Sequence, residues 1–105
     1  MAEKKSQTLN SKSQKIAPAR LAAFEILTKI EKEKAFSSAI LPVYEENLSV
    51  KDRALCHELT LGVLRRQIYL DRLIEKLTKK KIEKFDLAVV LALRIGLYQI
   101  LFLYF

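Results

Sequence analysis

The amino-acid sequence predicts an all-α fold of about five helices, and three observations lead to this class. Half of the 105 residues are hydrophobic, whereas only two are glycine and two are proline, so few positions favour turns. From residue 18 onward, apolar side chains recur with helical spacing. The length is that of one domain, and it is too short for a catalytic domain together with a cofactor-binding domain.

The net charge of +7 is concentrated near the N-terminus, because residues 1–20 contribute +4 of it. Such a balance suggests an acidic partner, either nucleic acid or an anionic membrane surface, although solubility alone also explains it. Residues 1–17 lack the apolar segment of a signal peptide and are rich in serine, glutamine, asparagine and lysine. We therefore predict that they form a disordered basic arm.

Two helices are predicted in the first half of the domain. The first covers residues 18–34, with Pro18 suited to its first turn. One face of this helix gathers Ala19, Ala23, Ile26, Leu27 and Ile30. A short second helix is predicted over residues 38–46, with Ser37 as its candidate N-cap. Pro42 must either kink this helix or start it.

A third helix is predicted to begin after Ser49. The Ser49 hydroxyl can accept a hydrogen bond from the backbone N–H of Asp52, whose carboxylate lies in the positive first turn. The buried stripe of this helix contains Leu55, Leu59, Gly62 and Val63. Because glycine within a helix costs ~1 kcal/mol relative to alanine, we expect Gly62 to permit the close approach of another helix.

Two adjacent arginines, Arg65 and Arg66, mark the end of this stripe, which restarts at Leu70. We therefore predict a bend at the arginines and a fourth helix after it. Arginines at such a corner can bond to the unsatisfied carbonyls of the preceding helix, or they can face solvent and an anion. On the fourth helix, Glu75 and Lys79 have the i, i+4 spacing that favours an ion pair.

The lysine-rich stretch KLTKKKIEK is predicted to form an exposed connection, which more often is a solvated loop than a binding site. After it, residues 87–105 are apolar on nearly all sides, with Asp86 as the candidate N-cap. This segment could span a bilayer, but Arg94 near its middle would cost at least ~2.5 kcal/mol there. We favour a central bundle helix with Arg94 and Tyr98 as a small polar strip, no membrane contact, and self-association through residues 87–105.

The sequence shows no catalytic signal. Cys56 and His57 are adjacent, so on a helix their side chains point about 100° apart, and no third group is evident to orient the imidazole. We interpret both as structural residues. A single cysteine allows neither a disulfide nor a CxxC zinc site, and it fits a cytoplasmic location. One histidine and two glycines exclude a metal cluster and a phosphate-binding glycine loop, so we expect no metal and no cofactor in this chain.

The segments LSVKDRALCHELTLGVLRRQIYLDRLIEKL and LALRIGLYQILFLYF resemble a known family. They are similar to the NusB-like N-terminal domain of bacterial ribosomal RNA cytosine-5 methyltransferases of the Sun (RsmB) family, and more distantly to antitermination factors of the NusB type. The similarity covers about residues 18–105. It implies a NusB-like helical bundle that is truncated at the C-terminus, because the helical domain of that family continues beyond the LYQ helix.

The resemblance also implies a function. In the methyltransferase branch, the helical domain precedes a catalytic domain that uses S-adenosylmethionine, and it helps to hold the ribosomal RNA substrate. The chain contains no cofactor loop and no Pro-Cys pair, since Cys56 follows Leu55. We therefore expect an RNA-binding domain rather than an enzyme, with the catalytic domain and further helices as its missing partners. The alternative is a stand-alone NusB-like antitermination or protein-interaction module.

Three basic patches are candidates for contact with RNA. They are Lys15 with Arg20 at the start of the first helix, Arg65 with Arg66 at the corner, and Lys79, Lys80 and Lys81 in the connection. NusB binds RNA through the start of its first helix, so the resemblance favours the first patch, where free N–H groups also attract phosphate. The corner arginines come second, because capping of carbonyls competes for them.

Overall fold

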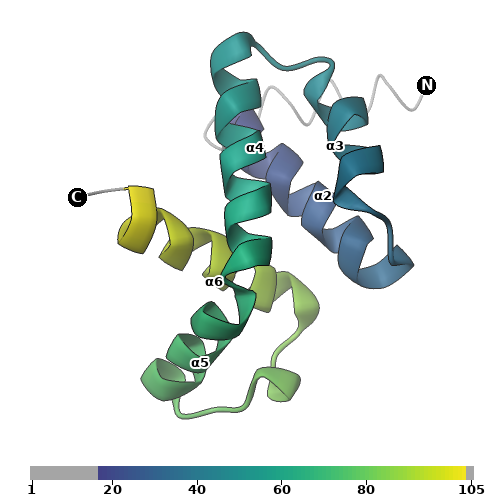
Figure 1. Cartoon of the computed structure of the whole chain (residues 1–105). Coiled ribbons are helices and arrows are strands. Elements are labelled where there is room, and N and C mark those ends of the chain that lie inside the picture. The colour runs from purple at the N-terminus through teal and green to yellow at the C-terminus, as the bar shows by residue number, and fades with distance from the viewer. Residues whose placement is uncertain (1–16, 104–105) are drawn as a thin grey trace.

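A computed structural model describes residues 17–103 of the chain, which fold into five α-helices with two shorter helical turns (Figure 1). The elements are α2 (Pro18–Glu33), α3 (Ser37–Glu45), α4 (Val50–Arg65), α5 (Gln67–Thr78), the 3-10 turn η2 (Ile82–Lys84), α6 (Leu87–Tyr98) and the π-helical turn η3 (Gln99–Leu103). The range contains no strand. These features confirm the predicted all-α class. The predicted basic arm lies outside the described residues, except for Ala17, which precedes α2.

The core lies where α2, α4 and α6 pack against one another (Figure 1). Helix α2 packs most extensively against α4, and its small buried alanines permit this close approach. The fully or almost fully buried side chains include Ala19, Ala23 and Ile26 of α2, Cys56, Leu59 and Val63 of α4, and Val90 and Leu91 of α6. The residues that periodicity placed on the α2 and α4 faces are buried, except that Ile30 and Leu55 are half-buried against the core.

The boundaries of α2 and α3 are set by backbone geometry. Helix α2 ends at Glu33 because Lys34 adopts the left-handed conformation, with φ of 57°. Helix α3 starts one residue earlier than predicted, since Phe36 and not Ser37 occupies the N-cap position. Pro42 lies inside α3 rather than at its start. The proline removes the hydrogen bond to the Ser38 carbonyl, but both residues are exposed and water can satisfy that carbonyl.

Helix α4 begins and packs as the sequence predicts. The Ser49 hydroxyl accepts a hydrogen bond from the Asp52 N–H at 3.1 Å. Gly62 is buried where α4 meets α6, and a Cβ atom there would overlap the ring and hydroxyl of Tyr98. The glycine therefore permits the close helix contact that was expected of it.

The bend between α4 and α5 occurs at Arg66, whose backbone has φ of −112° and ψ of 19° (Figure 1). The predicted Glu75–Lys79 ion pair is not formed. Lys79 leaves the helix with φ of 64°, so its side chain no longer occupies the i+4 position. Instead, Glu75 Oε2 accepts a hydrogen bond from the Ile82 N–H at 2.8 Å and fastens the lysine-rich connection to α5.

The predicted C-terminal helix is divided into α6 and the wider turn η3. Asp86 occupies the N-cap position of α6, but its backbone carbonyl, not its carboxylate, accepts the first N–H groups. No helix in the described range is long and apolar enough to cross a membrane.

Arg94 and Tyr98, which were predicted to form a small polar strip, each bond to a neighbouring helix. Arg94 donates two hydrogen bonds to the Asp71 carboxylate of α5, at 2.7 and 2.9 Å. The Tyr98 hydroxyl donates to Glu58 Oε2 of α4. Because both side chains are buried, each requires a partner, and each finds it on the neighbouring helix that it faces.

Candidate nucleic-acid interface

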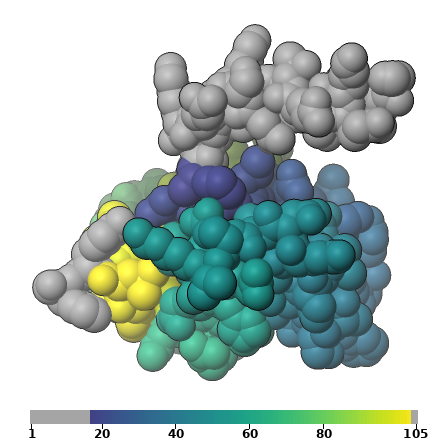
Figure 2. Space-filling model, turned by 90° about the horizontal axis from the view of Figure 1, so that it is seen from above, coloured from purple at the N-terminus to yellow at the C-terminus, as the bar shows by residue number. Residues whose placement is uncertain are grey.

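The first basic patch is described only at Arg20, because Lys15 lies outside the described residues. Arg20 is half-buried in the first turn of α2, and its Nε donates to Gln99 Oε1 at 2.6 Å. Gln99 in turn donates to the Ile95 carbonyl at 3.2 Å. Figure 2 shows the start of α2 (purple) beside the end of the described chain, which includes η3 (yellow). Arg20 therefore joins these two elements, and only its other guanidinium donors remain for an anion.

The surface next to Arg20 is hollowed between α2 and α6. This hollow has a volume of ≈ 420 Å³ and is lined mainly by apolar side chains, including Leu21, Phe24 and Ile95. Gly96 also lines it, and a Cβ atom there would meet no other group within 4 Å. Within the described residues, the first patch thus combines the Arg20 guanidinium, one of whose donors is already hydrogen-bonded, with an apolar hollow.

The second patch, Arg65 with Arg66, lies at the corner between α4 and α5. Both residues are exposed, and within residues 17–103 neither guanidinium has a hydrogen bond or an ion pair. The arginine that does bond to a carbonyl near a helix end is Arg53, which donates to Leu48 at 3.0 Å. Capping of carbonyls in that range therefore does not compete for the corner arginines.

Aromatic side chains support this corner. The guanidinium carbon of Arg66 lies 4.1 Å from the ring centroid of Phe102, which is the geometry of a cation–π contact. The ring of Tyr69 meets Phe102 edge to face, with centroids 6.3 Å apart and planes at 70°. Tyr98 packs on Phe102 with centroids 5.2 Å apart. We refer to Arg65, Arg66, Tyr69 and Phe102 as the corner cluster.

Sequence patterns did not identify the aromatic members of the corner cluster. Tyr69 follows Arg66 at i+3, a spacing that places neighbours on one helix face and could have identified the pair. Phe102 is far from both in sequence, and only the fold brings it to them. No local pattern could have shown that contact.

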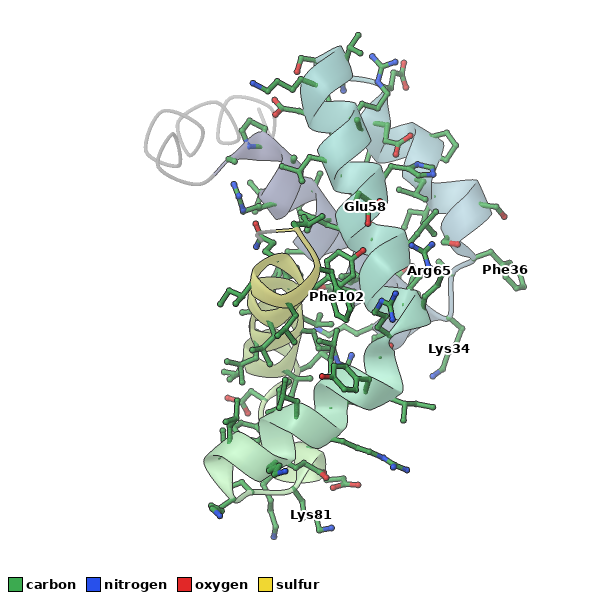
Figure 3. The ribbon with its side chains drawn as sticks, turned by 60° about the vertical axis from the view of Figure 1, so that its left-hand side comes forward. Lys34, Phe36, Glu58, Arg65, Lys81 and Phe102 are labelled. Atoms are coloured by element: carbon green, nitrogen blue, oxygen red, sulfur yellow. The ribbon has the colours of Figure 1, made fainter. Side chains whose placement is uncertain are left out.

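A buried polar contact lies beside the corner cluster. Figure 3 shows Glu58 and Arg65 on α4, close to Phe102 of the C-terminal turn. Burial and the hydrogen bond to the Glu58 carboxylate raise the pKa of the Tyr98 hydroxyl, and the charges of Arg65 and Arg66 partly oppose this shift. The hydroxyl therefore stays protonated at neutral pH and can donate to Glu58.

The third patch, Lys79, Lys80 and Lys81, is exposed in the turn after α5. Lys80 Nζ lies 4.6 Å from the ring centroid of Phe85. A shallow hollow of ≈ 340 Å³ is lined by the three lysines together with Arg72, Glu75 and Lys76, so two further cations join this patch. The 12 residues of α5 separate it from the corner by roughly 18 Å, and Lys81 lies far from Arg65 in Figure 3.

Cys56 and His57 occupy different environments. Cys56 is fully buried, and burial, together with the nearby Glu45 carboxylate, raises the pKa of its thiol. The His57 side chain is 54% exposed, and its Nδ1 lies 2.9 Å from Glu45 Oε2. Glu45, on α3, is the orienting group that was not evident in the sequence. In the part of the chain that is described, no group of three or more histidine, cysteine, aspartate or glutamate residues could hold a metal ion.

Comparison with known proteins identifies a family and several relatives. The profile of the NusB family matches residues 17–104. Proteins named ribosomal RNA small subunit methyltransferase B from Klebsiella pneumoniae and Escherichia coli are each 38% identical over 82 residues, and that of Cronobacter sakazakii is 37% identical over 82 residues. Each alignment covers 78% of this chain and 19% of the relative. No solved structure gives a significant match.

Proposed function

Since the chain belongs to the NusB family, we propose that it is an RNA-binding helical domain that helps a ribosomal RNA cytosine-5 methyltransferase to hold its substrate in the cytoplasm. The names of the three relatives support the methyltransferase branch over a stand-alone antitermination module. The chain covers 19% of their length, so we assign catalysis and the binding of S-adenosylmethionine to parts of the protein outside this chain.

The observation that best supports RNA binding is the corner pair. Arg65 and Arg66 are exposed and have no acidic partner among the described residues, so their positive charge is free to meet phosphate. Arg20 is already bonded to Gln99, and we therefore rank the corner above the start of α2. The lysine patch at the other end of α5 extends the positive surface.

The test compares the salt dependence of RNA affinity among three variants. We expect Arg65→Ala/Arg66→Ala to reduce the slope of log affinity against log salt by roughly 0.7 per lost charge, as for single-stranded RNA. Arg20→Ala and a triple alanine change at Lys79, Lys80 and Lys81 measure the other two patches. Lys51→Ala, an exposed change at the start of α4, is the single-charge control.

Circular dichroism should show that each variant keeps its helical content. A wild-type chain that binds no RNA would refute the function directly. If the chain binds RNA but all three patch variants leave both slope and affinity unchanged, the patches are wrongly assigned and their charge serves solubility.

A further inference from the structure

We propose that Tyr69 and Arg66 form a stacking site for an unpaired RNA base at the corner between α4 and α5. This inference depends on the proposed RNA-binding function and adds to it the type of contact. The phosphate backbone would meet the guanidinium groups, while one base lies flat on the exposed ring of Tyr69 or on the guanidinium plane of Arg66.

The stacking site is held in place by aromatic packing. Phe102 contacts both members, since Arg66 lies over its face at 4.1 Å and Tyr69 meets it edge to face. Phe102 is itself packed on Tyr98, which is 3% exposed and hydrogen-bonded to Glu58. A stacking surface held in this way loses little conformational entropy when a base binds.

Tyr69 is exposed to solvent. The residue is 54% exposed, although large aromatic residues are usually buried. Tyr69 is in T-shaped contact with Phe102, and its exposure leaves part of the residue accessible to a second ring. Proteins that bind single-stranded nucleic acid combine exposed aromatic rings of this kind with a positively charged groove.

The chemistry of the corner cluster favours one class of partner. A protein docking on the corner cluster would have to desolvate the guanidinium groups of Arg65 and Arg66, for which the described residues offer no ion-pair partner. Single-stranded RNA provides a phosphate for a cation and a flat apolar surface for a ring within one nucleotide. The combination at this corner therefore fits RNA better than an apolar protein surface.

The experiment measures the affinity of the full 105-residue chain for labelled oligoadenylate and for an abasic ribose-phosphate oligomer of the same length. Tyr69→Ala and Tyr69→Leu remove the aromatic face, and Tyr69→Phe keeps it. Ile68→Ala is the matched control, because Ile68 is the neighbouring residue of α5 and is 72% exposed. Thermal unfolding followed by circular dichroism checks that the fold is retained.

We expect Tyr69→Ala and Tyr69→Leu to weaken oligoadenylate binding about tenfold, which is within the range for one stacked base. Their salt slope should remain that of the wild type, because no charge is lost. Tyr69→Phe and Ile68→Ala should bind as the wild type does. Binding of the abasic oligomer should be equal for all of these proteins, since it has no base to stack.

Two results would overturn the stacking site while leaving RNA binding intact. One is a wild-type affinity for Tyr69→Ala when Arg65→Ala/Arg66→Ala binds weakly, which would mean that the corner contacts phosphate alone. The other is unchanged RNA affinity for Tyr69→Ala together with a loss of self-association in sedimentation, which would assign the ring to a protein contact. If the wild-type chain binds neither oligomer, the proposed function and the stacking site both fail.

Discussion

At Gly62, the backbone of α4 meets the ring of Tyr98, and a methyl group there would occupy the same space as that ring. Tyr98 cannot move freely, because it is buried and hydrogen-bonded to Glu58. We predict that Gly62→Ala lowers the free energy of unfolding by about 1–3 kcal/mol through overpacking. This loss should occur although alanine favours a helix by ~1 kcal/mol over glycine. Urea denaturation monitored by circular dichroism measures the change.

Gly96 is the matched control for this substitution. It lies within α6, and a Cβ atom there meets no other group within 4 Å. Gly96→Ala should therefore raise the free energy of unfolding by about 1 kcal/mol, through helix propensity alone. If Gly62→Ala proved as stable as Gly96→Ala, α4 and α6 would not be in the close contact described.

The role of Gly62 could be predicted from sequence, but its partner could not. Helical spacing placed the glycine on the buried stripe of α4, and the cost of glycine within a helix required a reason. Spacing contains no information on which distant residue fills the space, so Tyr98 and Phe102 were not connected to α4. The candidate site shows the same limit, since its charges were predicted and its aromatic support was not.

At the scale of elements, the Asp71–Arg94 pair joins α5 to α6. The side chain of Arg94 is 7% exposed and that of Asp71 is 22% exposed. Removing one partner of a buried pair leaves the other charge without compensation. We predict that Asp71→Asn lowers the free energy of unfolding by about 2–3 kcal/mol, somewhat less than for a fully buried pair because water still reaches Asp71.

A double-mutant cycle with Arg94→Gln isolates this pair. The double variant should be destabilised by less than the sum of the two single changes, because the second substitution no longer strands a charge. Additive effects would indicate that α5 is held to α6 by its apolar contacts alone.

Sequence patterns predicted both helices and the bend between α4 and α5. They did not predict this pairing, because Arg94 was assigned to a strip within its own helix.

At the scale of the whole molecule, the apolar C-terminal segment remains partly uncovered. Ile100 is 61% exposed and Leu101 is 39% exposed, and the hollow between α2 and α6 is lined mainly by apolar groups. Exposed apolar surface of this kind favours association in water. We therefore predict that the chain associates with itself through this face, and that its mean mass in sedimentation equilibrium exceeds 12.1 kDa increasingly as concentration rises.

The variant that tests this face is Ile100→Lys/Leu101→Lys, which places two charges on it and should shift the equilibrium toward the monomer. Val43→Lys is the control, because Val43 is 63% exposed but lies on α3. This control should associate as the wild type does. A wild-type chain that stays well folded and strictly monomeric at all concentrations would contradict the prediction. In that case, the exposed part of the C-terminal segment would be tolerated in water without a partner.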